Sequence, residues 1–251
     1  MSGISDKNIR TLKLFDLEIF EPLSGFSTGT DAVLLSAFVK GRPSEAAVEL
    51  GAGTGVVSLI CAAKRKFSHI YSVEIQKSLF SLLVRNTESN GLSEKVVPVC
   101  ADVRHLCPAD FPKVTSVFAN PPYMKVSSGK SSVSELRQIS RHEVFGGVTE
   151  FCFAAAKLLK TGGRFYTVYR PDRLETLMNA LKNSGFSPKR MTFVSSSGSA
   201  APSCVLTEAV LNGRESLFVT PTLFLKSNES ESPDAAYIYE NDEFPDKFQK
   251  P

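Results

Sequence analysis

The sequence predicts a doubly wound α/β fold of the Rossmann type, built on a mostly parallel sheet of seven strands. Apolar runs of strand length alternate with segments that have helical spacing along most of the chain. A glycine-rich turn follows the first of these strands. The last two strands are separated only by a loop of small residues, which predicts a hairpin and therefore one antiparallel strand.

Each element can be placed in order from its apolar pattern. The expected strands are Ala46–Glu49, His69–Glu74, Val96–Asp102, Ser116–Ala119, Arg164–Arg170, Met191–Ser195 and Cys204–Leu211. The expected helices are one that begins after Gly55, then Gln76–Glu88, Thr149–Lys160 and Pro171–Ser184. Asn90-Gly91 closes the second helix, and we expect Gly162-Gly163 to stop the third. Strands joined through helices make right-handed crossovers, which predict parallel pairing.

Residues 1–225 are expected to form a single domain. Residues 11–23 carry alternating apolar positions and could form a small N-terminal hairpin. Residues 226–251 contain three lysines against seven acidic residues, and we expect an acidic, loosely held C-terminal tail. Tyr123–Ser140, rich in Ser and Lys, is expected to be an irregular substrate loop.

Composition excludes a disordered or membrane-spanning chain. Hydrophobic residues make up 42% of the 251 positions and charged residues 22%, and no apolar run is long enough to cross a bilayer. The polar N-terminus and five scattered cysteines predict a cytoplasmic protein with reduced thiols. The net charge of +3 divides into a basic body and an acidic tail, and Lys160–Arg190 alone carries +5. This distribution is compatible with a phosphate-bearing partner, although ordinary surface charge explains it equally well.

The glycine turn and two acidic residues predict a nucleoside cofactor site. Glu49-Leu50-Gly51-Ala52-Gly53-Thr54-Gly55 lies between a strand and a helix, where ligands bind at the carboxyl ends of parallel strands. Glu74 ends the next strand and could accept hydrogen bonds from ribose hydroxyls, and Asp102 ends the third and could accept the adenine amine. The Gly-x-Gly-x-Gly spacing, followed by Val56, favours S-adenosylmethionine over NAD. The alternative is that the glycines only close a loop and the acids are helix caps.

Asn120-Pro121-Pro122-Tyr123 follows the fourth strand and predicts methylation of an amino nitrogen. The Asn120 side-chain oxygen and the Pro121 carbonyl could both accept from one amino group, which would favour pyramidal geometry and expose the nitrogen lone pair. The prolines fix the backbone and have no N–H. Tyr123 offers an aromatic face for a base. The alternative is a rigid turn with Tyr123 in the core.

Other reactive residues give weaker evidence of a function. No Pro-Cys dipeptide occurs in the sequence, which argues against cytosine C5 methylation. Cys100, His105 and Cys107 have no evident fourth ligand, so we expect no metal site. His142 is more typical of a helix start or loop anchor than of a catalytic group.

In these motifs the chain resembles the class I methyltransferases, and more narrowly the bacterial tRNA1(Val) adenine-N6 methyltransferases. The resemblance runs from about Leu14 to Leu225. It rests on the following segments: Thr28-Gly29-Thr30-Asp31, Val33-Leu34-Leu35, Glu49–Gly55, Asn120–Tyr123, Ser140-Arg141-His142-Glu143, Gly162-Gly163-Arg164-Phe165 and Tyr169–Leu174. The resemblance implies S-adenosylmethionine as cofactor, a tRNA substrate methylated on the purine beside the anticodon of a valine tRNA, and a role for Thr30 and Asp31 at the methionine end of the cofactor.

Several alternative functions remain open at this point. Asn-Pro-Pro-Tyr is shared with protein glutamine-N5, ribosomal RNA guanine-N2 and DNA adenine methyltransferases, so the motif indicates chemistry rather than substrate. The glutamine enzymes usually carry a separate N-terminal helical domain, and the residues before the glycine turn are too few for one. A non-catalytic RNA-binding module and an NAD oxidoreductase are disfavoured, the first by intact Glu74, Asp102 and Asn120, the second by Val56.

Overall fold

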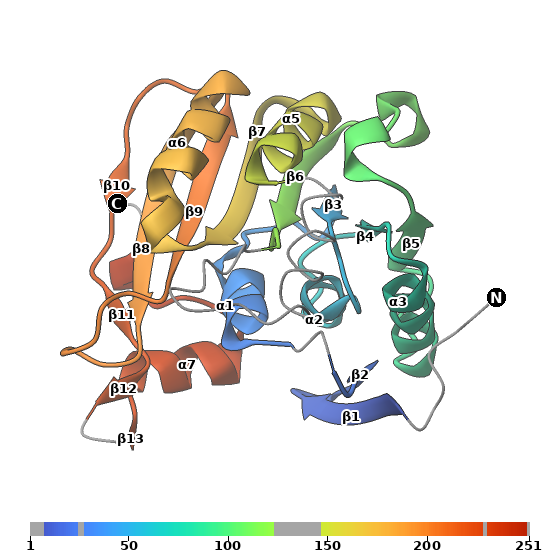
Figure 1. The fold of residues 1–251 in the computed structure, drawn as a ribbon, viewed down its shortest axis with the longest axis horizontal. Helices are drawn as coiled ribbons and strands as arrows, with labels where there is room; N and C mark the ends of the chain where they lie inside the picture. Colours follow the sequence, from blue (N-terminus) through green and yellow to red (C-terminus); the bar gives the residue numbers. More distant parts are fainter. Residues whose placement is uncertain (1–7, 25–27, 123–146, 228–229, 250–251) are drawn as a thin grey trace, which may run out of the picture.

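A twisted, mostly parallel sheet forms the centre of the protein (Figure 1). The computed structural model describes residues 8–24, 28–122, 147–227 and 230–249. In this part of the chain the sheet has nine strands in the order β10-β8-β9-β7-β6-β3-β4-β5, and β11 also pairs with β8. The strands are β3 Ala46–Leu50, β4 His69–Glu74, β5 Val96–Cys100, β6 Val114–Ala119, β7 Leu159–Tyr169, β8 Phe186–Ser195, β9 Cys204–Leu211, β10 Phe218–Val219 and β11 Leu223–Phe224.

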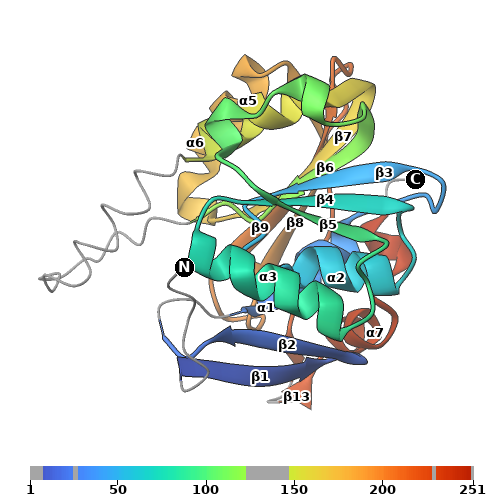
Figure 2. The same ribbon diagram turned by 90° about the vertical axis from the view of Figure 1, so that its right-hand side faces the viewer.

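Helices cover both faces of this sheet, as Figure 2 shows. One face carries α1 (Thr30–Phe38), α2 (Val56–Ala63) and α3 (Lys77–Ser89), and the other carries α5 (Val148–Leu158) and α6 (Leu174–Asn183). Central strands covered on both sides are continuously apolar rather than alternating, which explains the buried runs in β3 and β6. The predicted doubly wound α/β fold is confirmed. β9 is the antiparallel strand, paired with both β7 and β8, and the two short strands β10 and β11 are additions to the expected seven.

The third predicted helix ends earlier than its glycines indicated. Helix α5 stops at Leu158, and Gly162-Gly163 lie inside β7 instead of terminating the helix. The pairing of β6 with β7 shifts from Val114–Leu159 to Ser116–Arg164, so residues 160–163 form a bulge in β7. Gly162, at φ +79°, provides the left-handed conformation that this bulge requires.

The N-terminal hairpin is present as β1 (Ile9–Leu14) and β2 (Leu17–Pro22). Two asparagine side chains attach it to the domain, Asn86 of α3 and Asn90, which caps the end of that helix. The Asn86 amide accepts from the Phe20 N–H at 2.7 Å and donates to the Phe20 carbonyl at 3.0 Å. Asn90 makes the equivalent pair with Glu18, at 2.9 and 2.8 Å. The amide groups therefore take the place of a neighbouring strand along β2.

The expectation of a loosely held C-terminal tail is wrong. The described residues 226–227 and 230–249 form the strand pair β12 (Lys226–Ser227) and β13 (Ser230–Glu231), then helix α7 (Pro233–Asn241) and a short 3₁₀ turn, Asp246–Phe248. Ser232 caps α7 by accepting from the Ala235 N–H, and Pro233 occupies its first turn. Phe244 and Phe248 are buried, and Phe244 packs edge-on against Phe38 of α1. These aromatic contacts outweigh the polar composition of the segment.

A buried ion pair fixes the end of α7 to the domain. Asp242 is 1% exposed, and its carboxylate accepts from Ser36 Oγ at 2.7 Å and lies 2.8 Å from Lys66 Nζ. The Lys66 ammonium also donates to the carbonyls of Ser36, Val39 and Asp242. Three segments, α1, the loop after α2 and the C-terminal segment, therefore meet at one charge pair. Within the described ranges, no helix has the length and apolar character needed to cross a membrane.

We expect Asp242→Asn to lower the free energy of unfolding by about 3 kcal/mol, because breaking a buried pair leaves the Lys66 charge without compensation. Asparagine tolerates the left-handed backbone of this position, φ +51°, so the loss reports the charge rather than strain. Chemical denaturation measures the effect, with the exposed neighbour Glu243→Gln as control. Equal unfolding free energies for the two variants would show that the pair is dispensable.

Candidate active site

Three adjacent strands bring the motif residues together at one edge of the sheet, the carboxyl edge, where β3, β4 and β6 end. Leu50 pairs with Val73 on one side and with Ala119 on the other. The next positions along these strands are Gly51, Glu74 and Asn120. Neighbouring strands lie about 4.8 Å apart, so these three backbone positions span roughly 10 Å. The glycine turn therefore lies between the proposed cofactor carboxylate and the Asn-Pro-Pro motif.

The glycine turn is tightly packed as well as tightly bent. Gly51, Gly53 and Gly55 have φ values of +68°, +58° and +88°. A Cβ atom on Gly55 would lie 2.3 Å from Leu83 Cδ1, and one on Gly51 would lie 3.0 Å from the Phe151 ring. The left-handed backbone favours glycine at these two positions, and any Cβ there would also force the side chains of Leu83 in α3 or Phe151 in α5 to shift.

Glu74 connects the glycine turn to β4 and keeps acceptor capacity for a ligand. Its buried carboxylate accepts from the Gly53 N–H at 2.8 Å and from the Gln76 N–H at 2.7 Å. Burial raises the pKa of Glu74, and these backbone donors oppose the increase. The Ile75 N–H is a third backbone donor to this carboxylate. A carboxylate has about four acceptor sites, so about one remains for a ligand hydroxyl.

A buried hydroxyl in the same turn also fits a polar ligand. Thr54 is fully buried, and its Oγ1 has no hydrogen-bond partner among the described residues. The buried Oγ1 of Thr28, in the segment before α1, also has no hydrogen-bond partner among the described residues. Native proteins rarely leave buried polar groups unpaired, so these hydroxyls are consistent with a bound ligand that supplies the missing partners. The donors and acceptors present at this edge thus fit the ribose and amino-acid groups of S-adenosylmethionine.

Asp102 is paired within the protein, which the sequence did not indicate. Its carboxylate caps the turn Val103–His105 by accepting from the Arg104 N–H at 2.9 Å, and it accepts from the Arg104 guanidinium at 3.0 and 2.5 Å. The hydrogen bonds from Arg104 lower the pKa of Asp102, so the carboxylate is ionised. An adenine amine would have to displace the Arg104 side chain to reach it.

Glu49 lies beneath the turn and not in front of it. The side chain is 2% exposed and accepts from the Ser58 N–H at 3.0 Å and from the Ser58 hydroxyl. Ser72 of β4 donates to Ser58 Oγ at 2.6 Å, which extends the network into the sheet. Glu49 therefore joins β3 to the first turn of α2, and we do not propose direct cofactor contact for it.

Thr30 and Asp31 begin α1, and each is engaged by a residue that sequence reasoning missed. The Thr30 hydroxyl is hydrogen-bonded to Tyr239 of α7. Asp31 is hydrogen-bonded to the thiol of Cys204, the first residue of β9. Burial and the Asp31 carboxylate raise the pKa of Cys204, so the thiol keeps its proton. Both contacts join distant segments, and no local pattern in the sequence indicates either.

The basic residues of Lys160–Arg190 do not form one patch. Residues 160–190 cross the whole sheet. Arg170 and Arg173 lie at the carboxyl edge, where Arg170 pairs with Asp172 at 2.8 Å. Lys160, Arg164 and Arg190 lie toward the opposite edge, and Arg190 is buried. Because β7 and β8 each run from one edge to the other, a count along the chain merges two separate surfaces. Tyr123 and the rest of the expected substrate loop lie outside the described residues.

Comparisons with known proteins find similarity to tRNA methyltransferases. A model of the TRM5/TYW2 methyltransferase domain matches residues 33–122. A protein of Vibrio cholerae named tRNA1(Val) (adenine(37)-N6)-methyltransferase is 27% identical over 132 residues, which is 53% of this chain and 52% of that protein. A Bacteroides fragilis protein of the same name is 27% identical over 175 residues, covering 69% and 73%. The chain spans about half the length of the first of these relatives.

Solved structures share the fold. A predicted O-methyltransferase from Agrobacterium tumefaciens superposes with a TM-score of 0.69 at 19% identity, covering 86% of this chain and 98% of that one. Trm5 from Methanocaldococcus jannaschii, in complex with adenosine, gives a TM-score of 0.57 at 18% identity, covering 82% and 56%. The class I methyltransferase fold and the resemblance to the tRNA1(Val) adenine-N6 methyltransferases are confirmed.

The buried Glu49 predicts a specific pH dependence of stability. Burial raises the pKa of this carboxyl to about 8, whereas in an unfolded chain it lies near about 4.3. Between these values the folded state binds one proton more than the unfolded state, so stability falls as the pH rises. Glu49→Gln removes this pH-dependent contribution to the free energy of unfolding. Its unfolding free energy should rise relative to the wild type by about 1.4 kcal/mol per pH unit between pH 5 and pH 8.

Denaturant titrations of both proteins at several pH values measure this difference. Glu94→Gln, an exposed glutamate substitution, is the matched control and should run parallel to the wild type. A constant offset between Glu49→Gln and the wild type across this range would contradict a raised pKa.

Proposed function

We propose that this protein is an S-adenosylmethionine-dependent methyltransferase that methylates the N6 amino group of an adenine in tRNA. The observation that carries the proposal is the arrangement of Gly51, Glu74 and Asn120 at adjacent positions on three paired strands. This arrangement puts a nucleoside-binding turn directly beside a motif that can hold an amino group. When bound, the cofactor supplies an activated methyl group on a sulfonium.

Residues of β3, β4 and α1 would hold the cofactor. Glu74 has acceptor capacity for a ribose hydroxyl, and the buried Thr54 hydroxyl in the same turn has no hydrogen-bond partner among the described residues. Thr30 and Asp31, fixed through Tyr239 and Cys204, begin the helix that we assign to the methionine end. Asp102 becomes an acceptor for adenine if Arg104 moves aside. The preorganised turn supplies positioning, which is the main contribution such a reaction needs from the protein.

Asn120 and Pro121 would hold the acceptor nitrogen. Pro121 is buried and Asn120 is half-buried, directly after the buried strand β6. The side-chain oxygen of Asn120 and the carbonyl of Pro121 would accept the two hydrogens of the amino group, which directs the nitrogen lone pair at the methyl carbon. Neither proline has an N–H that could compete for these acceptors. Catalysis then depends on orientation and on stabilising the positive charge that develops on nitrogen.

The substrate assignment draws on the relatives and not on the geometry alone. The Vibrio cholerae and Bacteroides fragilis proteins are named for adenine 37 of tRNA1(Val), and the Trm5 fold neighbours are also tRNA methyltransferases. We extend this substrate to the present chain and assign the protein to the cytoplasm, where tRNA is modified. Methylation of guanine in RNA or of glutamine in a protein would use the same amino chemistry, and product analysis separates these outcomes.

The cofactor assignment predicts that Glu74→Gln weakens S-adenosylmethionine binding roughly tenfold to a hundredfold, because a charged acceptor for the ribose is lost. Isothermal titration calorimetry measures the affinity. Glu88→Gln, on the exposed side of α3, is the matched control. Thermal unfolding without cofactor shows whether the turn itself has been disturbed. Unchanged affinity in a folded Glu74→Gln protein would refute the ribose assignment.

The function predicts transfer of labelled methyl groups from S-adenosylmethionine to bulk tRNA, with N6-methyladenosine as the product after nuclease digestion. Asn120→Ala should lower the transfer rate on the order of a hundredfold or more while cofactor affinity stays near that of the wild type, since Asn120 is assigned to the acceptor.

If Asn120→Ala kept most of the methyl-transfer rate, Asn120 would be only a turn residue and not part of the acceptor site. N2-methylguanosine in RNA or methylglutamine in protein would replace the substrate but keep the amino chemistry. The absence of transfer to tRNA, RNA or protein by a preparation that binds the cofactor would refute the function.

A further inference from the structure

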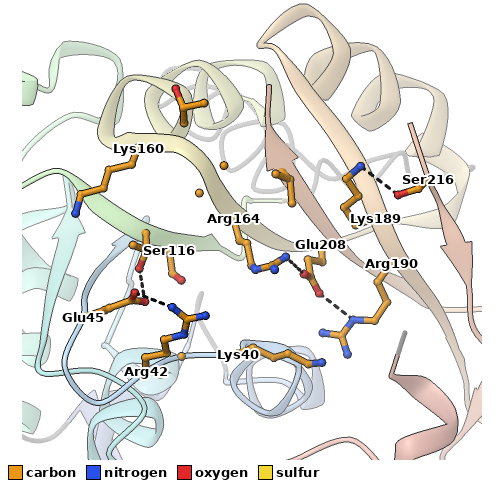
Figure 3. Close-up of a pocket in the computed structure, with 16 residues that line it drawn as sticks. Lys40, Arg42, Glu45, Ser116, Lys160, Arg164, Lys189, Arg190, Glu208 and Ser216 are labelled. Carbon is orange, nitrogen blue, oxygen red and sulfur yellow. Dashed lines mark hydrogen bonds and ion pairs between the residues drawn. The ribbon is translucent and has the colours of Figure 1, made fainter. Parts of the chain in front are cut away.

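A second cleft lies at the amino edge of the sheet, where β3, β6 and β7 begin, on the side opposite the candidate active site. It has a volume of about 740 Å³ (Figure 3). Its walls come from the segment between α1 and β3, the start of β6, the bulge of β7 and the adjoining parts of β8 and β9. No residue that we assign to the cofactor or to the acceptor nitrogen lines it.

The cleft carries more positive than negative charge. Six cationic residues line it, namely Lys40, Arg42, Lys160, Arg164, Lys189 and Arg190, against the two carboxylates Glu45 and Glu208. Both carboxylates are already engaged. Glu208 accepts from Arg164 at 2.7 Å and from Arg190 at 3.0 Å, and Glu45 accepts from Thr115 at 2.7 Å. The net charge of the lining is therefore +4, and no acidic group in it is left to neutralise a further cation.

Two lysines contribute charge without a protein partner. The ammonium groups of Lys40 and Lys160 make no hydrogen bond or ion pair within the described residues, and both side chains are exposed. Partial burial is the main cause that lowers the pKa of Lys40, and the repulsion of Arg190 and Arg164 adds to it against the opposing attraction of Glu208 and Glu243. A bound anion would relieve that repulsion.

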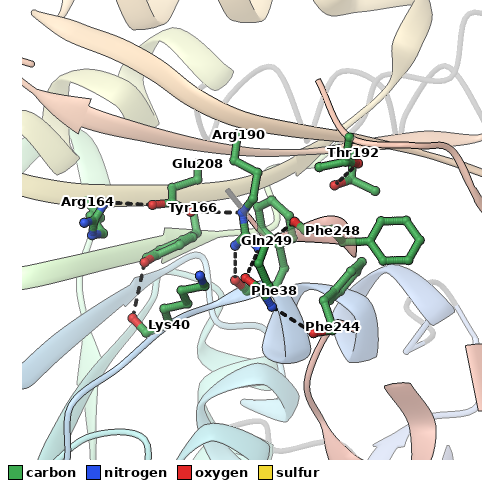
Figure 4. Close-up of polar contacts among 11 residues, drawn as sticks. Phe38, Lys40, Arg164, Tyr166, Arg190, Thr192, Glu208, Phe244, Phe248 and Gln249 are labelled. Atoms are coloured by element: carbon green, nitrogen blue, oxygen red, sulfur yellow. Dashed lines mark hydrogen bonds and ion pairs between the residues drawn. The ribbon is translucent and has the colours of Figure 1, made fainter. Parts of the chain in front are cut away.

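The floor of the cleft is fixed by Arg190 (Figure 4). Its guanidinium is 1% exposed and donates to the Phe38 carbonyl at 2.8 Å and to Gln249 Oε1 at 3.0 Å, as well as to Glu208. The group also lies 3.8 Å above the Phe38 ring. One carboxylate is thus shared by two guanidinium groups, so the floor is rigid and still carries a net positive charge.

The composition of the lining limits what the cleft can hold. Among the residues that the structure describes, Val210 is the one large apolar residue in the lining, and none of the lining residues is aromatic. A nucleobase or an apolar ring would find no face on which to stack, and stacking is a main source of affinity for bases. Clustered lysines and arginines with nearby hydroxyls are instead the usual recognition elements for phosphate oxygens.

We propose that the amino-edge cleft is a binding site for the phosphate groups of a phosphate-bearing ligand, separate from the methyl-transfer site. Lys40 and Lys160 contact the ligand directly, and Arg164 and Arg190 set the field beneath it. The phosphates come either from the backbone of an RNA or from a free oligophosphate. Phosphate binding at this site requires no methyl transfer, so it can be tested independently of the methyltransferase function.

The first experiment uses sodium tripolyphosphate as the probe, titrated into the full-length protein by calorimetry at low salt. The double variant Lys40→Ala/Lys160→Ala should raise its Kd about tenfold or more, through the loss of two charge-assisted contacts. Lys64→Ala, an exposed lysine at the end of α2, is the control and should bind as the wild type does. Both lysines of the double variant are exposed, so its folding should be intact, and thermal unfolding verifies this.

The second experiment separates the two sources by measuring tRNA binding through fluorescence anisotropy across a series of salt concentrations. If the cleft holds RNA phosphates, the double variant weakens tRNA binding, flattens its salt dependence, and tripolyphosphate competes with tRNA. If it holds a free oligophosphate, tripolyphosphate binding is lost in the variant while tRNA binding is unchanged. Wild-type affinity of the folded double variant for both probes, or no tripolyphosphate binding to the wild type, would overturn the proposal.

Discussion

The buried guanidinium of Arg190 is the constraint to which much of this structure is adapted. Removing a charge from water costs several kcal/mol, and the cost is recovered only when the group is paired and its donors are satisfied. Arg190 achieves this with acceptors from three segments far apart in the sequence: Glu208 of β9, the Phe38 carbonyl at the end of α1, and Phe248 and Gln249 near the C-terminus. None of these segments can move without leaving a buried charge unpaired, so the antiparallel end of the sheet, α1 and the C-terminal segment are held as one unit.

This constraint explains why the C-terminal segment could not be assigned from its composition. The sequence there is acidic and rich in serine, which is typical of a solvated tail. Its order depends on a few positions. Phe244 packs against Phe38, and Asp242 pairs with Ser36 and Lys66, which lie about 180 to 200 residues earlier in the chain. The strands and helices of the central sheet, by contrast, follow from local apolar periodicity, and β4 and β9 have the predicted limits. Periodicity reports burial along one element, whereas the anchoring of the tail depends on pairs formed across the fold.

In the candidate site, too, the sequence predicts the positions of residues along strands but not the contacts formed across the fold. That Gly51, Glu74 and Asn120 share an edge follows from strand order and parallel pairing, so it could be predicted from the sequence. The partners of these residues could not. Arg104 occupies the carboxylate of Asp102, Ser58 turns Glu49 away from the edge, and Tyr239 reaches Thr30 from a segment expected to be unstructured. The first two contacts are local, and an arginine two residues after an aspartate could have indicated the pairing. The third depends on the Arg190 and Asp242 contacts that hold α7 in place.

The two edges of the sheet differ in the charge of their residues, and strand β6 runs from one edge to the other. At the carboxyl edge Glu74 is buried beside the glycine turn, and Asp102 remains ionised because Arg104 lowers its pKa, so carboxyl groups face the proposed site of the cationic cofactor. At the amino edge the cations outnumber the carboxylates, an environment suited to an anion. Strand β6 begins at the cleft with Ser116 in its lining and ends immediately before Asn120, a distance of about 13 to 17 Å at the usual rise per residue. A methyl donor that is cationic and a substrate that is polyanionic thus have separate, electrostatically opposite sites on one rigid sheet.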